Sequence, residues 1–294
     1  MRLDDGVFTP IRGDTEVVSD GRVWIPSSAK SLIQELQGIR ERAFAQDHLA
    51  LFRGHADFNW CLDSTIARTI KEVIFGFRPG EIPTDDCASD RFFAQTLYGA
   101  FLFKCGGAGR PSHELMALAE SDDGIDPWFE WMKHQQQFPD KDHRTLKGSF
   151  LIDWTVSESV ASWFATAAKT PNCPAAVLVA DVSASGSVHA TGKLRSTLDA
   201  MEQHDWLERA FPGLPLLFCP PKQTLMARAN AQQARYLAQM DLRWPIDHVW
   251  RAKEAEIGKR IYIKVKIKPS LRSRVRKELK ALGITEATIL PDCA

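Results

Sequence analysis

Residues 150–165 read FLIDWTVSESVASWFA and join two different hydrophobic periods. The apolar run at 150–152 indicates a buried strand, and apolar residues recur at helical spacing from Ser157 to Ala168. A buried strand therefore runs directly into the N-terminus of a helix.

The junction at Thr155 has two interpretations. Thr155 with Glu158 three residues later matches a capping box, in which the two side chains satisfy backbone N–H groups of the first helical turn. The same geometry makes a seat for an anion or a nucleotide, because free N–H groups and a hydroxyl point outward. Spacing alone favours the capping box.

Strands and helices mix along the rest of the chain without a strict βαβ rhythm, which indicates an α+β fold. Helices are expected at 29–44, 86–104, 127–138 and 271–282, and strands at 48–52, 175–180, 214–218 and 261–267. We expect residues 1–26 to form an irregular N-terminal extension and residues 27–294 to form a single domain.

The composition is that of a globular protein. Hydrophobic residues make up 44% and charged residues 25% of the 294 residues, which excludes disorder, collagen and coiled coil as descriptions of the whole chain. No apolar run reaches the length of a membrane span, and the N-terminus has no apolar signal core. We therefore expect a cytoplasmic protein with no membrane partner.

The cysteines and histidines do not form a metal-binding pattern. None of the six cysteines forms a CxxC pair or lies at ligand spacing from a histidine, and the eight histidines are scattered. We expect reduced thiols and no bound metal, as is usual in the cytoplasm.

Positive charge gathers near the C-terminus although the formal net charge is zero. The segment 251–280, called here the basic block, holds twelve Lys or Arg and three Asp or Glu, a local charge of +9 (12 − 3). Within it, isoleucines and valine alternate with lysines over 261–268, typical of a solvated outer strand guarded by lysines. The other interpretation is a surface that binds the phosphate backbone of nucleic acid.

Arg53 ends an apolar strand at a glycine, in Leu51-Phe52-Arg53-Gly54-His55. Such an arginine can present a rigid fork to a phosphate or carboxylate, and the glycine permits close backbone approach. Alternatively, Arg53 binds a nearby carboxylate and holds the strand end in place.

A late polar segment offers a third candidate. If the chain is extended after Ala238, Gln239 and Asp241 share one face, because strand side chains alternate. Two polar groups beside a cleft can orient ribose hydroxyls. The alternative is an exposed junction between a helix and a loop.

Together these motifs resemble the FRG domain, a bacterial family named for its Phe-Arg-Gly signature. The resemblance rests on Phe52-Arg53-Gly54 with Trp60 and Arg68, on the block Leu151–Thr155 with Val160-Ala161 and Phe164-Ala165, and on Arg235 with Gln239. The core motifs lie at 49–68, 150–168 and 230–243, followed by the basic strand and helix at 259–283.

The order of these blocks is similar to that of the ADP-ribosyltransferase fold. That likeness implies a mixed, mostly antiparallel sheet split into two small sheets, and NAD as the substrate. It implies that Arg53 binds NAD and that Gln239 or Asp241 stabilises the ribose as the glycosidic bond breaks. The other implied NAD-binding residues are Gly54, His55, Trp154, Thr155, Ser157 and Arg235.

The family resemblance also suggests a biological role, a toxin or phage-defence effector that modifies protein or nucleic acid. An antitoxin or another defence protein is then an expected partner. The competing hypothesis is a non-catalytic module that binds a nucleotide or nucleic acid through Arg53 and the basic block.

Overall fold

The computed structural model of the chain describes residues 3–11, 13–104, 113–121, 126–137, 146–167, 172–184, 190–191, 216–218 and 227–291. The strands are β1 (Thr15–Val18), β2 (Val23–Pro26), β3 (Ala50–His55), β4 (Leu151–Thr155), β5 (Ala175–Asp181), β6 (Ala190–Thr191), β7 (Leu216–Phe218), β8 (Ala234–Ala238) and β9 (Tyr262–Ile267). The helices are α1 (Ala29–Ala45), α2 (Thr65–Ile74), α3 (Asp85–Ser89), α4 (Arg91–Leu102), α5 (His113–Ser121), α6 (Pro127–Gln137), α7 (Glu158–Ala167), α9 (Ala227–Ala231), α10 (Ile246–Ile257), α11 (Arg272–Ala281) and α12 (Glu286–Ile289), with the 3-10 turn η2 (Pro269–Leu271) before α11.

The described strands form one mixed sheet in the order β1-β2-β9-β5-β3-β4-β8-β7-β6. The pairs β2–β9 and β6–β7 are parallel, and the other neighbouring pairs are antiparallel. The prediction of an α+β fold with a mostly antiparallel sheet is therefore confirmed.

The expected division into two small sheets is wrong, because β3 and β4 join the two parts. Their register contains the single pair Phe52–Thr155, whereas β3 pairs with β5 over six residues and β4 pairs with β8 over five. The strands thus diverge on either side of this pair, and Arg53 and Asp153 lie beside the point of divergence.

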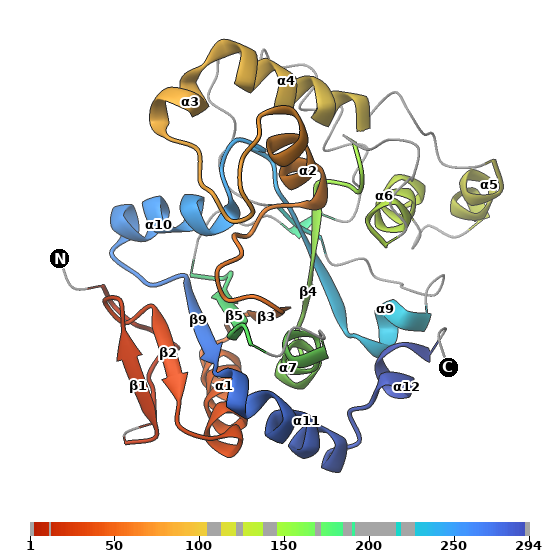
Figure 1. Cartoon of the computed structure of the whole chain (residues 1–294). Coiled ribbons are helices and arrows are strands. Elements are labelled where there is room, and N and C mark those ends of the chain that lie inside the picture. The colour runs from red at the N-terminus through yellow and green to blue at the C-terminus, as the bar shows by residue number, and fades with distance from the viewer. Residues whose placement is uncertain are drawn as a thin grey trace.

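Helices cover both faces of the sheet (Figure 1). On one face α1, α7 and α11 bury their apolar sides against β3, β5 and β9 in a single cluster. Farther along the same face, a second cluster joins α2, α4 and α6 to β4 and β8 through Leu151 and Tyr236. On the other face α10 packs through Ile246 and Trp250. Burial from both sides explains why β5 is a continuous apolar run, as is typical of a central strand.

Several predicted elements need correction. Residues 1–26 are not irregular throughout, because β1 and β2 form a hairpin that pairs with β9 through Val23 and Trp24. β9 therefore lies between β2 and β5 and is not an outer strand. The single helix expected at 86–104 is interrupted at Asp90, whose side chain accepts a hydrogen bond from Phe93 N at 2.8 Å and begins α4.

The other predicted helices and strands are found within a few residues of the expected bounds, for example α1, β5 and α11. The ends of three predicted elements lie outside the described residues. They are Phe138 of one helix, Ala168 of another helix and residues 214–215 of a strand.

Gly54 fixes the distance between β3 and α7. A Cβ atom at this position would lie 2.5 Å from the backbone nitrogen of Ala165 and would also overlap the carbonyl oxygen of Ala161. The strand can lie against the helix backbone only because residue 54 has no side chain.

We predict that Gly54→Ala lowers the free energy of unfolding by about 3 kcal/mol, because neither backbone atom can move without shifting the helix. Urea unfolding measures the change. Gly99→Ala on α4 is the control: its Cβ would meet nothing within 4 Å, so this variant gains about 0.5–1 kcal/mol. Equal stability of Gly54→Ala and the wild type would contradict the packing described here.

Candidate functional site

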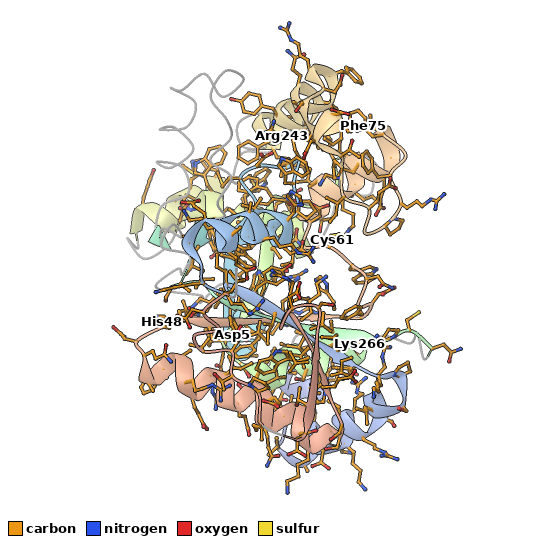
Figure 2. All side chains as sticks on the ribbon, turned by 90° about the vertical axis from the view of Figure 1, so that its left-hand side faces the viewer. Asp5, His48, Cys61, Phe75, Arg243 and Lys266 are labelled. Carbon is orange, nitrogen blue, oxygen red and sulfur yellow. The ribbon has the colours of Figure 1, made fainter. Side chains whose placement is uncertain are left out.

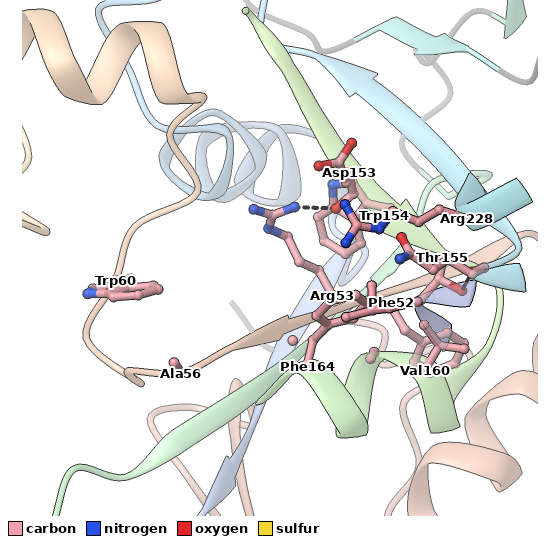
Figure 3. Close-up of a pocket in the computed structure, with 14 residues that line it drawn as sticks. Phe52, Arg53, Ala56, Trp60, Asp153, Trp154, Thr155, Val160, Phe164 and Arg228 are labelled. Carbon is pink, nitrogen blue, oxygen red and sulfur yellow. Dashed lines mark hydrogen bonds between the residues drawn. The ribbon is translucent and has the colours of Figure 1, made fainter. Parts of the chain in front are cut away.

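A cavity of about 380 Å³ opens where β3 and β4 meet (Figure 3). Its other walls include the N-terminal half of α7, the helix α9 and the turn that follows α9. The described residues that line it are Phe52, Arg53, Gly54, Ala56, Trp60, Asp153, Trp154, Thr155, Val160, Ala161, Phe164, Arg228, Gln232 and Leu290. The volume lies near the lower end of the range of small-molecule sites, about 300–1,000 Å³.

Arg53 extends from β3 toward β4. One terminal nitrogen donates a hydrogen bond to the backbone carbonyl of Asp153 (Figure 3). The Arg53 Nε donates to His55 Nε2 at 3.2 Å. Burial lowers the pKa of Arg53 to about 10, although the nearby Asp153 carboxylate opposes this change. Arg53 is therefore held by internal partners and still faces a cavity.

Asp153 is the carboxylate of the cavity. Burial raises its pKa, and the positive charges of Arg53, Lys133 and Arg228 oppose the rise, as does a hydrogen bond with Gln136. Because strand side chains alternate, Asp153 and Thr155 share one face of β4. The arrangement brings an acidic group, two arginines and a hydroxyl to one cavity.

Thr155 lies in the cavity wall, but its hydroxyl serves the local backbone. It donates to the carbonyl of Gln232 at 2.7 Å and accepts from Ser157 N at 2.9 Å. The expected capping box between Thr155 and Glu158 is wrong, because the Ser157 hydroxyl accepts from Val160 N at 3.3 Å and caps α7 instead. Glu158 forms an ion pair with Arg40 at 2.8 Å.

Gly54 and Trp154 also line the cavity, as the resemblance predicts for binding residues, whereas three other expected residues lie beside it. His55 is buried and makes a T-shaped ring contact with Trp60, and Ser157 is buried at the start of α7. Arg235 pairs with Trp154 across β8 and β4 and donates to the carbonyl of Ala234 at 2.8 Å. None of these three is among the described residues that line the cavity.

Gln239 does not reach the cavity, contrary to the expected convergence. Its side chain is 1% exposed, accepts from Ser64 N at 2.7 Å, and donates to Asp63 at 2.8 Å and to the carbonyl of Trp244 at 2.9 Å. Asp63 also binds Lys71 through both carboxylate oxygens at 2.9 Å. Gln239 therefore joins the end of β8 to the start of α2.

Asp241 is also directed elsewhere. It forms an ion pair with Arg243 at 2.9 Å, and Arg243 donates in turn to the carbonyl of Ala88 in α3. Figure 2 shows Arg243 in the upper part of the molecule, away from Lys266 in the lower part. The expectation that Gln239 or Asp241 faces Arg53 across one cleft is therefore wrong.

Several cations of the basic block bind other segments of the chain. Lys264 donates to the carbonyl of Trp60 at 3.1 Å, Arg272 to the carbonyl of Ala56, and Arg260 to the carbonyl of Asp20 at 2.6 Å. Arg251 donates to the Tyr262 hydroxyl at 2.8 Å. These side chains are oriented by the fold and are not presented together as one surface.

The sequence motifs included Trp60, Asp153, Phe164 and Gln232 but did not assign them to the site, and they missed Arg228. One signal for Asp153 was present: it is the single charged residue of an apolar strand, two positions before Thr155. Arg228 and Gln232 come from α9 and the turn after it, and no periodic pattern there indicates a site.

Comparison of the chain with protein-family models, characterised proteins and solved structures gives no match. Within the described residues, no group of three or more His, Cys, Asp or Glu side chains is arranged to hold a metal ion. Among the helices that the structure describes, none is both long enough and apolar enough to cross a membrane.

We predict that Gln239→Leu lowers the free energy of unfolding by about 2–3 kcal/mol, because the buried N–H of Ser64 loses its partner. Chemical denaturation measures the effect. Gln34→Leu, at an exposed position of α1, changes stability by less than about 0.5 kcal/mol. If the two variants are equally stable, the Gln239 contacts do not hold β8 and α2 together.

A second prediction concerns His55, whose pKa lies well below its usual value. Burial is the main cause, and the charges of Arg53, Lys264 and Arg68 add to it. As the pH falls below about 6.5, the unfolded chain takes up a proton at His55 that the folded protein does not, so stability falls with pH.

Between pH 7.5 and 5.5 the wild type should therefore lose about 1 kcal/mol more than His55→Gln, measured by urea unfolding at both values. The comparison cancels the titration of all other groups. An identical loss in both proteins would show that His55 takes up its proton as readily when folded.

Proposed function

We propose that the cavity between β3 and β4, called here the Arg53 cavity, binds NAD. The protein then cleaves the glycosidic bond of NAD in the manner of an ADP-ribosyltransferase. The observation that carries the proposal is the meeting of Arg53, Arg228 and Asp153 in one cavity with aromatic walls. The resemblance to the FRG domain and, through its block order, to the ADP-ribosyltransferase fold supports the same conclusion.

The residues of the cavity suit a nucleotide. Guanidinium groups bind phosphate oxygens through paired hydrogen bonds. Arg53 of β3 and Arg228 of α9 both line the cavity. Trp60 and Phe164 are 40% and 36% exposed and offer apolar faces to a planar ring. A volume of about 380 Å³ suits one nucleotide half of NAD, with the other half at the mouth.

NAD, when bound, supplies an ADP-ribosyl group whose bond to nicotinamide breaks as positive charge develops on the ribose. In this proposal Asp153 replaces Gln239 and Asp241 as the group that stabilises that charge, because it is the carboxylate among the described cavity residues. Arg53 and Arg228 hold the phosphates. Attack by water or by the hydroxyl of an acceptor releases nicotinamide and one proton.

The competing hypothesis of nucleic-acid binding through the basic block has less support. Seven of its twelve cations have internal partners: Arg251, Lys253, Arg260, Lys264, Lys266, Arg272 and Arg276. A protein or nucleic-acid acceptor, a role as a toxin or phage-defence effector and an antitoxin partner remain predictions from the resemblance.

Calorimetric titration with NAD tests the proposal, followed by chromatography for released nicotinamide. We expect the wild type to bind NAD and Arg53→Lys to raise Kd by at least about tenfold, because lysine keeps the charge and loses the planar fork. Arg235→Lys, on β8 outside the cavity, should change Kd by less than about twofold.

Thermal melts of all three proteins show whether they are folded. A folded wild type that does not bind millimolar NAD, or an Arg53→Lys variant that binds as tightly as the wild type, would contradict the proposal.

A further inference from the structure

Trp60 belongs to a segment that several distant parts of the chain hold in place. The segment 56–62, called here the Trp60 loop, connects β3 to the residues before α2 and carries the indole to the edge of the cavity (Figure 3). A connecting loop is normally the most mobile part of a site. Here, backbone groups of the loop are bound at four positions.

Two contacts hold its first half. Arg272 from α11 donates to the carbonyl of Ala56, and Phe58 N donates to the carbonyl of Pro174 at 2.8 Å. The ammonium groups of Lys264 and Lys266 lie 5.8 and 5.0 Å from the centre of the Phe58 ring, as in cation–π pairs.

An ion pair holds the second half. Lys264 from β9 donates to the carbonyl of Trp60 at 3.1 Å, and Asp247 from α10 accepts from Leu62 N at 3.1 Å. The two charged groups lie 3.6 Å apart, with side chains 13% and 5% exposed, so water screens them less than an ordinary surface pair. Together they bind the backbone on both sides of Cys61.

The indole itself is 40% exposed. It forms a T-shaped contact with the His55 ring at a centroid distance of 5.9 Å. A large aromatic side chain with a fixed backbone and an exposed face is a suitable platform for a planar ring. The direction of that face depends on the backbone at Trp60, which Lys264 binds.

We propose that Trp60 is the surface on which the aromatic ring of the ligand stacks, and that Lys264 and Asp247 are positioning residues that fix it there. The inference rests on the proposed function, because it assigns the ring of a nucleotide to one wall of the Arg53 cavity. In this proposal Lys264, a residue of the basic block, has a structural role in the site.

Hydrogen exchange tests the ion pair without any ligand. Lys264→Met should raise amide exchange in peptides covering the Trp60 loop by about tenfold, because the carbonyl of Trp60 loses its donor. Lys268→Met is the matched control, since it removes the same charge from an exposed lysine just beyond β9. Lys264→Arg, which keeps a donor, should restore most of the protection.

Titration with two ligands then tests the stacking surface. Trp60→Leu and Lys264→Met should each weaken NAD binding by about tenfold and leave binding of ribose 5-phosphate, which has no planar ring, unchanged. Trp60→Phe should keep most of the affinity. In the double variant Trp60→Leu/Lys264→Met, the second change should add little, because both act through one ring.

The outcomes separate the two proposals. If Lys264→Met behaves like Lys268→Met in exchange and in NAD affinity, or weakens ribose 5-phosphate equally, the positioning role is overturned while the NAD site stands. If the wild type binds neither ligand, the proposed function and the stacking role fail together. The exchange measurement then still decides whether Lys264 holds the loop.

Discussion

The partly buried guanidinium of Arg53 constrains the centre of this protein. A charge removed from water needs hydrogen bonds and an opposite charge, and Arg53 finds them at the carbonyl and carboxylate of Asp153 and at His55. Burial still lowers its pKa to about 10, so these partners offset the loss of hydration only in part. The positive charge of Arg53 also helps to lower the pKa of His55 beside it. The cavity opens where β3 and β4, which share one register pair, diverge next to Arg53.

The excess of positive charge near the C-terminus acts within the fold. Lys264, Arg272 and Arg260 each donate to a backbone carbonyl of a segment that precedes them by more than 200 residues. Long cationic side chains suit this task, because they reach across a surface and keep their apolar stems packed. A local charge of +9 therefore does not by itself indicate a nucleic-acid surface. Its position beside the Trp60 loop connects the basic block to the cavity.

Much of the fold could be predicted because its central elements have strong hydrophobic periods. The apolar run of β5, the alternation of β9 and the passage from β4 into α7 each follow from local sequence. The meeting of Arg53 and Thr155 was expected from the motifs, and the register pair Phe52–Thr155 brings it about. The short strands β1 and β2 could not be predicted, because they are defined by pairing with each other and by the pairing of β2 with β9, and not by a local pattern.

The direction of Gln239 depends on tertiary contacts in the same way. The sequence predicted an extended chain after Ala238, whereas the strand β8 ends at that residue. Whether a polar side chain there faces a cavity or a neighbouring helix is decided by the donors and acceptors beside it. Ser64 and Asp63 supply those partners, and the sequence between 64 and 239 gives no sign of these contacts.

The most direct measurement of the central claim is a crystal structure of the protein soaked with NAD. The account predicts phosphate or ribose oxygens within hydrogen-bond distance of Arg53 and a ring against Trp60. Nucleotide bound elsewhere, or an unchanged cavity at saturating NAD, would contradict it.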